Sequence, residues 1–214
     1  DRAGIAGEDG PTHHGALDIA YLKCVQDLIV SSPRNGNELR NLLYTALEYK
    51  DGPFAIRYPK ASSEEFDQNL QGELLPIGSW EVLQNGNDVA ILAVGPLTYL
   101  ALEAAEELKK LDISCEVVNC RFIKPMDENY LEFMLEKFSS VLTIEEGVRS
   151  GGFGEGVLSW LSSNNYKGNS SIISLPDKFV EHGPRDLLLE KWGINKEQII
   201  KTVTSFKSSL KTEF

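Results

Sequence analysis

Apolar, strand-like runs alternate regularly with amphipathic helical segments after residue 76, and this alternation is the strongest constraint on the fold. Four apolar runs predict buried strands: Asp88–Gly95, Cys115–Phe122, Val141–Ile144 and Ser171–Pro176. Helical spacing predicts helices over 97–111, from Pro125 to 138, around 157–161, near 185–192 and over about 195–210. Strands that alternate with helices predict an α/β fold with a mainly parallel sheet flanked by helices.

The first sixty residues predict a smaller α/β unit. Asp27–Pro33 and Pro53–Pro59 each indicate a short strand, and Asn37–Tyr49 has helical periodicity between them. Lys60–Pro76 is polar, acidic and without period, which is typical of a linker. We therefore expect one domain over residues 1–60, a linker over 61–76 and a second domain over 77–214.

Charge and cysteine content exclude several classes of function. The chain has 21 Lys and Arg against 32 Asp and Glu, a net charge of −11. That sign argues against nucleic acid or an anionic membrane as a partner, but it leaves room for an anionic small molecule. The apolar runs are too short to span a bilayer. The three cysteines show no CxxC spacing, which favours free thiols in a reducing compartment over a zinc site.

The opening stretch DRAGIAGEDGPTHHG is the first candidate site. It is too rich in glycine for a helix, and it carries Arg2, Asp9, His13 and His14. An arginine can bind a phosphate or carboxylate with two hydrogen bonds, and an imidazole can exchange protons near neutral pH. Asp9 lies four residues before His13, which it could orient. A solvated surface turn remains the alternative. The stretch has no initiator Met, so we expect Asp1 to be the cut end of a longer chain.

Arg57, inside the segment FAIRYP, is the second candidate. A charge in a strand must reach a partner or the rim of the sheet, because an unpaired buried charge is costly. Ligand sites of parallel sheets lie beyond the carboxyl ends of the strands. The opening loop and the end of the Arg57 strand could therefore meet at one site. The alternative is an edge-strand arginine that points into water.

Two further motifs have a structural interpretation. GGFGEG, which follows TIEEGVRS, is not GxGxxG, and Glu145, Glu146 and Glu155 would repel a phosphate at the following helix. We expect tight packing of strand and helix there. His182 lies in a polar turn, where a capping, surface or interface role is favoured over catalysis.

Five blocks of the sequence together resemble one enzyme family: DRAGIAGEDGPTHHGALDIAYL, DGPFAIRYPK, LPIGSWEVL, TIEEGVRSGGFGEGV and LPDKFVEHGPRDLLL. They are similar to the 1-deoxy-D-xylulose-5-phosphate synthases, thiamine-diphosphate enzymes of the transketolase group. The resemblance covers essentially the whole chain and corresponds to the C-terminal third of that family. It implies part of a pyrimidine-binding domain, followed by a transketolase C-terminal domain.

The resemblance also implies roles for individual residues. Arg2 and Arg57 would bind the phosphate of glyceraldehyde 3-phosphate. Asp9 and His13 would line the same pocket as catalytic residues, with His13 also contacting the substrate. The resemblance supports a site role for His14 less than for His13, and it implies no role for Tyr58.

The family joins pyruvate to glyceraldehyde 3-phosphate with loss of carbon dioxide, a first step in isoprenoid precursor synthesis that also serves thiamine synthesis. Its diphosphate- and Mg²⁺-binding GDG…N segment and its cofactor-contacting glutamate do not occur in this chain, so we expect them upstream of Asp1. The chain alone is then expected to bind no thiamine diphosphate and to be inactive. The resemblance implies a homodimer in the bacterial cytoplasm or a plastid-type organelle.

Two alternatives remain open. The chain could be the β subunit of a thiamine-dependent 2-oxoacid dehydrogenase, which would need an α subunit and an acyl carrier. It could also be a non-catalytic module for folding or dimerisation.

Overall fold

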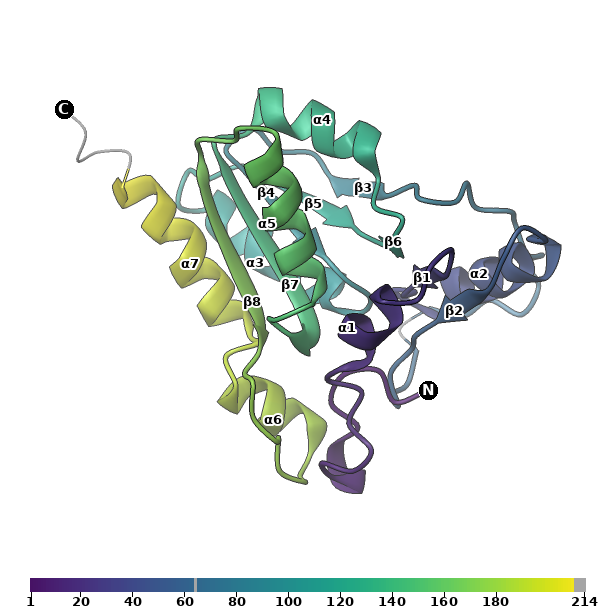
Figure 1. Cartoon of the computed structure of the whole chain (residues 1–214). Coiled ribbons are helices and arrows are strands. Elements are labelled where there is room, and N and C mark those ends of the chain that lie inside the picture. The colour runs from purple at the N-terminus through teal and green to yellow at the C-terminus, as the bar shows by residue number, and fades with distance from the viewer. Residues whose placement is uncertain (64, 210–214) are drawn as a thin grey trace.

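A five-stranded sheet organises the second part of the chain in this computed structural model, which describes residues 1–63 and 65–209 (Figure 1). Its order is β3-β5-β4-β7-β8. The strands are β3 (Glu81–Gln84), β4 (Val89–Ala93), β5 (Cys115–Asn119), β7 (Ser140–Val148) and β8 (Asn169–Leu175). β4 runs parallel to β5 and β7, and β7 runs parallel to β8, while β3 is antiparallel. The predicted mainly parallel sheet is confirmed.

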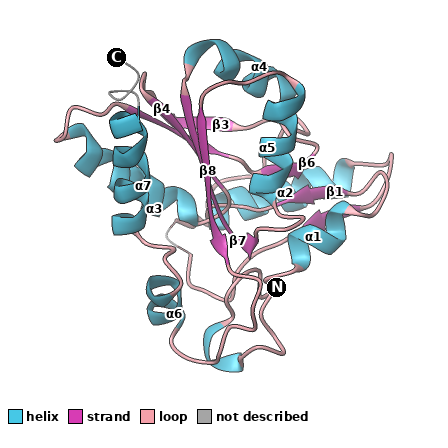
Figure 2. Cartoon of the chain, turned by 60° about the vertical axis from the view of Figure 1, so that its left-hand side comes forward, coloured by secondary structure: helices cyan, strands magenta, loops and turns pink. Residues whose placement is uncertain are grey.

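Helices cover both faces of this sheet, as Figure 2 shows. α3 (Leu97–Lys109) and α7 (Lys196–Ser209) lie on one face, and α4 (Glu128–Lys137) and α5 (Phe153–Ser163) lie on the other. The central strand β4 divides its residues between the two cores. Val89, Ile91 and Ala93 pack with α3 and α7, whereas Ala90 and Leu92 pack with α4 and α5. This alternation explains why the strand is apolar throughout, because each face of a pleated strand meets its own helical layer.

The N-terminal part forms a second, three-stranded sheet of order β2-β1-β6. β1 (Ile29–Ser31) pairs in parallel with β2 (Phe54–Ile56), and α2 (Gly36–Glu48) connects them. β6 (Phe122–Lys124) adds to β1 in antiparallel orientation. Within the described residues, β1 is therefore the central strand of this sheet, and one of its two neighbours comes from the second half of the chain.

The predicted strand Cys115–Phe122 is therefore two strands in two sheets. The chain leaves the large sheet after Asn119, where the Cys120 amide donates to Ala93 O at 2.9 Å. Phe122 is fully buried, and its ring packs with Leu42 and Phe54 in the small sheet's core. The strand-like pattern of this segment cannot reveal that its two ends enter different cores.

One element boundary and one edge strand also differ from the sequence prediction. α4 begins at Glu128 rather than at Pro125, because Asp127 caps it by accepting a hydrogen bond from the Tyr130 amide at 3.0 Å. β3 was not predicted, since its four residues are mostly half-exposed and lack an apolar run. The expected end of the last helix at Leu210 lies outside the described residues.

Residues 60–76 lie between β2 and β3, and those described there form neither helix nor strand. Three polar side chains of α2 at helical spacing accept hydrogen bonds from this segment's backbone. Asn37 accepts from the Asp67 amide at 2.9 Å, Asn41 from the Glu73 amide at 3.0 Å, and Thr45 from the Leu75 amide at 2.9 Å. The segment is therefore bound along one side of α2 while most of its side chains stay exposed.

Candidate functional site

The first fifteen residues form a closed loop. The Gly15 amide donates to Arg2 O at 2.9 Å and to Gly4 O at 2.8 Å, and the Gly4 amide donates back to Gly15 O at 3.2 Å. A Cβ on Gly15 would lie 2.5 Å from Arg2 O, so only glycine allows this closure. Arg2 itself has a φ of 65°, an uncommon conformation for a residue with a side chain and one that is enriched at functional sites.

Arg2, Asp9 and Lys60 form an ion-pair cluster at the surface of this loop. Arg2 Nε donates to Asp9 Oδ2 at 3.0 Å, and Lys60 Nζ donates to Asp9 Oδ1 at 2.8 Å. The Arg2 and Lys60 side chains are 37% and 53% exposed. The hydrogen bonds from Lys60 and Arg2 lower the pKa of Asp9 from 3.8 to about 2. Asp9 is thus a permanent carboxylate near neutral pH, and it holds two cations at an open surface.

The two adjacent histidines have different environments. His13 is exposed, and its Nδ1 lies 3.0 Å from Thr12 Oγ1. His14 connects two parts of the backbone: its Nδ1 accepts from the Ala6 amide at 2.9 Å, and its Nε2 lies 3.1 Å from Glu181 O. The amide is a donor only, so Nδ1 must be unprotonated and Nε2 carries the proton. His14 is a structural bridge, whereas His13 is accessible to a ligand. Asp9 contacts Arg2 and Lys60, which differs from the expectation that it orients His13.

Arg57 directly follows β2, and its side chain is only 6% exposed. Its Nε donates to Asp18 Oδ2 at 2.9 Å, and its Nη2 donates to Glu146 O at 3.2 Å. The alternative of an arginine pointing into water is therefore wrong. The Ala3 amide donates to Tyr58 O at 3.0 Å, which joins the segment after Arg57 to the segment after Arg2. The structure thus brings together the two arginine-bearing segments, from positions more than fifty residues apart.

Glu146, on β7, is the centre of a buried charge network that sequence reasoning missed. Its carboxylate accepts from the Ile5 amide at 3.1 Å and forms an ion pair with Arg185, at the start of α6 (Arg185–Lys191). Burial raises the pKa of Glu146 against the opposing effect of Arg185. The pair Glu145-Glu146 at the end of an apolar strand was a usable signal, since buried charges require partners. No comparable sequence pattern marked Asp18 or Lys60 as a member of the site.

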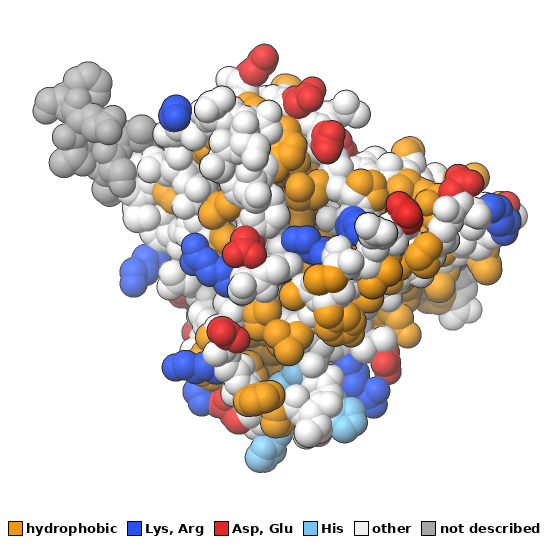
Figure 3. All heavy atoms as spheres, in the orientation of Figure 1, with side chains coloured by type: hydrophobic (Ala, Val, Ile, Leu, Met, Phe, Trp, Pro, Cys, Tyr) orange, Lys and Arg blue, Asp and Glu red, His pale blue; other side chains and the backbone are white. Residues whose placement is uncertain are grey.

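This loop lies at one end of the molecule. Figure 3 shows histidine side chains gathered at the end that carries α6 and the short 3₁₀ helix η1 (Gly7–Asp9), with Lys and Arg side chains beside them. Gly183 N donates to Gly7 O at 3.3 Å, so the turn before α6 supports the loop. α1 (Asp18–Lys23) continues from the loop and brings Asp18 beneath Arg57.

The GGFGEG turn binds a carboxylate of its own chain. Glu145 accepts hydrogen bonds from the amides of Phe153 and Gly154, at 2.9 and 2.7 Å, at the start of α5. Burial raises the pKa of Glu145 despite these two bonds. A Cβ on Gly152 would lie 2.7 Å from Glu145 Oε1, which explains the glycine there. The helix terminus is therefore filled, and it does not fit a diphosphate group.

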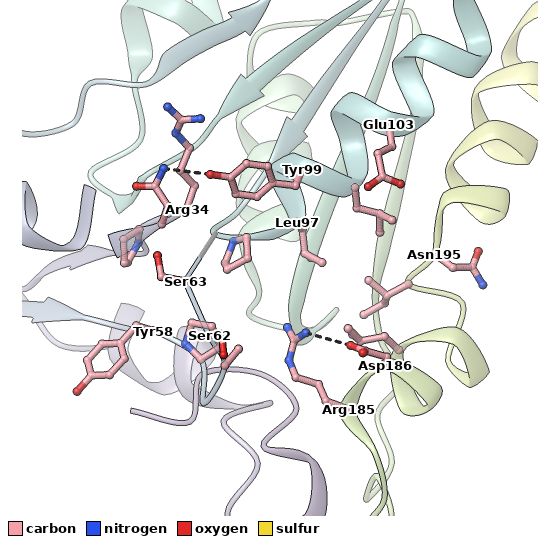
Figure 4. A pocket seen from close by; sticks show the side chains of 18 of the residues that line it. Arg34, Tyr58, Ser62, Ser63, Leu97, Tyr99, Glu103, Arg185, Asp186 and Asn195 are labelled. Atoms are coloured by element: carbon pink, nitrogen blue, oxygen red, sulfur yellow. Dashed lines mark hydrogen bonds and ion pairs between the residues drawn. The ribbon is translucent and has the colours of Figure 1, made fainter. Parts of the chain in front are cut away.

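A cleft of about 590 Å³ lies beside the network, at the carboxyl ends of β1 and β4 (Figure 4). Tyr58, Tyr99 and Arg185 are among its lining residues, and Asn35 Nδ2 donates to the Tyr99 hydroxyl at 3.0 Å. Within the described part of the chain, Arg2, Asp9, His13 and Arg57 are not among the residues that line this cleft. The predicted residues thus lie outside the cleft, although Tyr58, the neighbour of Arg57, and Arg185, the partner of Glu146, line it.

The described residues offer neither a metal-binding cluster nor a membrane-spanning helix. Within residues 1–63 and 65–209, no three His, Cys, Asp or Glu side chains lie together in a way that would hold a metal ion. None of the helices in the described part of the chain combines the length and apolar character needed to cross a membrane.

Comparison with known proteins identifies both parts of the fold. The transketolase pyrimidine-binding domain matches residues 1–64, and the transketolase C-terminal domain matches residues 78–199. The 1-deoxy-D-xylulose-5-phosphate synthase of Geobacillus sp. (strain WCH70) is 45% identical over 206 residues, and that of Bacillus cereus (strain AH820) is 42% identical. Each alignment covers 95% of this chain but 32% of the relative, so the chain spans about a third of their length.

A solved structure gives the same result. A split-gene transketolase, described as an inactive β4 tetramer, superposes with a TM-score of 0.81 at 30% identity. The superposition covers 92% of this chain and 63% of that one. The chain belongs to the transketolase family, and it matches the C-terminal third of the 1-deoxy-D-xylulose-5-phosphate synthases.

Proposed function

We propose that this chain supplies the acceptor-substrate side of a synthase that joins pyruvate to glyceraldehyde 3-phosphate, with decarboxylation, to give 1-deoxy-D-xylulose 5-phosphate. The observation that carries the proposal is the bond from the Ala3 amide to Tyr58 O, which joins the Arg2 and Arg57 segments. The exposed His13 belongs to the same opening loop as Arg2. Two guanidinium groups and an accessible imidazole are the groups that an aldehyde carrying a phosphate would need.

In this proposal, Arg2 and Arg57 bind the substrate phosphate. Binding energy from this remote group would orient the aldehyde for reaction. Asp9 holds the Arg2 guanidinium and Lys60 in place, while Asp18 fixes Arg57 from beneath. His13 donates a hydrogen bond to the hydroxyl that forms from the aldehyde oxygen, and it can transfer a proton there.

Thiamine diphosphate and Mg²⁺ belong to the complete enzyme in this proposal. The described residues do not fit them, since Glu145 fills the start of α5 and no metal-binding cluster is found among residues 1–63 and 65–209. When bound, the cofactor supplies the carbon–carbon bond chemistry. This chain's part is to bind and orient the acceptor. We also propose a homodimer, located in the bacterial cytoplasm or a plastid-type organelle.

Kinetics can test the assignment in a polypeptide that joins this chain to the N-terminal part of the Geobacillus relative. Losing a charge-assisted hydrogen bond costs about 1.5–3 kcal/mol, so Arg2→Ala and Arg57→Ala should each raise the KM for glyceraldehyde 3-phosphate at least about tenfold. The KM for pyruvate should stay within about twofold. Lys109→Ala, at the exposed end of α3, serves as the control. An unchanged KM for glyceraldehyde 3-phosphate in both arginine variants would contradict the assignment.

The domain division proposed for this chain is residues 1–60, a linker over 61–76, and residues 77–214. Limited proteolysis should first cut the exposed segment between Lys60 and Pro76, where most side chains face solvent. First cuts inside β4 or α5 would contradict this division.

A second candidate is a non-catalytic assembly of identical chains. The description of the split-gene relative as an inactive tetramer favours it. Exposed apolar side chains on α1 and α2 are compatible with such contacts, since Tyr21 is 61% and Leu47 is 70% exposed. Sedimentation analysis of the chain by itself tests this candidate, and a monomer at micromolar concentration would contradict it.

A further inference from the structure

Glu146 lies at an irregularity in the large sheet. The register between β7 and β8 shifts between Ile144 and Val148, and Glu145 and Glu146 are both buried within this interval. The two carboxylates have separate partners. Glu145 caps α5, whereas Glu146 faces the loop formed by residues 1–15. At this irregularity, Glu145 therefore contacts a helix of the second domain, whereas Glu146 contacts the N-terminal part of the chain.

Glu146 contacts both segments that carry the proposed phosphate-binding arginines. Its Oε2 accepts from the Ile5 amide at 3.1 Å, in the loop that bears Arg2. Its backbone carbonyl accepts from Arg57 Nη2 at 3.2 Å. Its Oε1 forms an ion pair with Arg185, whose side chain is 20% exposed and which also lines the neighbouring cleft. A single residue of β7 therefore connects both arginine-bearing segments to α6.

The loop is packed directly onto this carboxylate. A Cβ on Gly4 would lie 2.4 Å from Glu146 Oε2, and Gly4 has a φ of +68°, so no other residue fits there without a shift. Close contact of backbone with a side chain leaves little freedom for the loop to move independently of β7. A buried ion pair is often no more stabilising than apolar residues of similar volume, so keeping one suggests a purpose other than stability.

We propose that Glu146 is a positioning residue for the acceptor site, which fixes the Arg2 loop against Arg57 so that both guanidinium groups can bind one phosphate. This inference rests on the proposed function, because it assumes that the two arginines bind the same anion. Glu146 need not touch substrate; it acts through Ile5, Arg57 and Arg185. Misplacing binding groups by about 1 Å can weaken their action strongly, so small movements of the loop matter.

Titration of the ¹⁵N-labelled chain with inorganic phosphate tests the inference, with the Nε–H signals of Arg2 and Arg57 as reporters. Glu146→Gln keeps the side-chain shape and an acceptor for Ile5, but it loses the charge that holds Arg185. It should weaken phosphate binding at least about fivefold and speed hydrogen exchange at the Ile5 amide. Glu145→Gln is the matched control. It alters a buried glutamate of the same strand that caps α5, and should leave both readouts within about twofold of the wild type.

A second variant guards against misfolding of the first. Arg185→Gln removes a half-buried partner and leaves Glu146 in place, and it should change both readouts in the same direction. Unchanged phosphate affinity in Glu146→Gln and Arg185→Gln, or an equal loss in Glu145→Gln, would overturn the inference and leave the proposed function standing. If phosphate moves neither arginine signal in the wild type, the shared anion site fails and the inference fails with it.

Discussion

Replacing Glu145 with alanine should destabilise the second domain, because its carboxylate accepts hydrogen bonds from two buried backbone amides. Glu145 has no exposed surface, and it accepts from the amides of Phe153 and Gly154 at 2.9 and 2.7 Å. Alanine would leave both amides without an acceptor at the start of α5. An unsatisfied buried amide costs about 1–3 kcal/mol, which gives a gross loss of about 2–6 kcal/mol.

Burial of the Glu145 carboxylate reduces the stability that Glu145→Ala loses. The pKa of Glu145 is raised from its ordinary 4.5, mainly by desolvation, so its ionised form is costly in the fold. Removing it regains part of that cost, and we expect Glu145→Ala to lower the free energy of unfolding by about 2–4 kcal/mol. Glu145→Gln keeps one acceptor oxygen in a side chain of the same shape, so its loss should be about 1–2 kcal/mol.

The effect of pH has a definite sign. A carboxyl whose pKa is raised by folding contributes stability below its unfolded value, and that stability is lost as pH rises through the folded value. Wild-type stability should therefore decline as pH rises above 4.5 toward the raised pKa of Glu145. The Gln variant should show a smaller decline over that interval, since it has no group to ionise at this position.

Urea unfolding followed by circular dichroism measures the stability loss, and hydrogen exchange at Phe153 and Gly154 shows whether it begins at α5. The Ala and Gln variants are compared with the wild type at one pH below 4.5 and one near neutrality. A Glu145→Ala protein within about 0.5 kcal/mol of wild type would refute the reasoning, because deletion would then have left no unsatisfied amides. Equal losses in the two variants would refute the acceptor role itself.

Three further predictions concern other groups. The Asp9 carboxyl should titrate with a pKa of about 2 by NMR, so its contribution to stability is lost as pH falls below 3.8. Lys60→Ala should raise this pKa, and an unchanged pKa would contradict the ion pair between Lys60 and Asp9. Asp18→Ala should lower the free energy of unfolding by about 3–5 kcal/mol in urea, because it leaves Arg57 buried and unpaired. Of the three thiols, only the exposed Cys24 should react quickly with Ellman's reagent. Burial raises the pKa of Cys115 to about 12 and also raises the pKa of Cys120. Rapid reaction of two thiols would contradict this prediction.

The sequence predicted most of the large sheet because its signals are local. Each parallel strand of that sheet contains several apolar residues in sequence, and each crossover helix has its own periodicity. The edge strand β3 escaped prediction because half-exposed residues carry no such run. The division of Cys115–Phe122 between two sheets escaped it because Phe122 belongs to a core made with Leu42 and Phe54, distant in sequence.

The candidate site divides in the same way. The sequence by itself determined which residue types are available: an arginine and two histidines on a glycine-rich loop, and a second arginine after a short strand. Only the tertiary structure decided that His14 is a bridge, that Arg57 is buried on Asp18, and that Glu146 joins the two halves. The physical reason is that secondary structure follows from neighbours along the chain, whereas the partner of a charge is set by burial and distance between segments that only folding brings together.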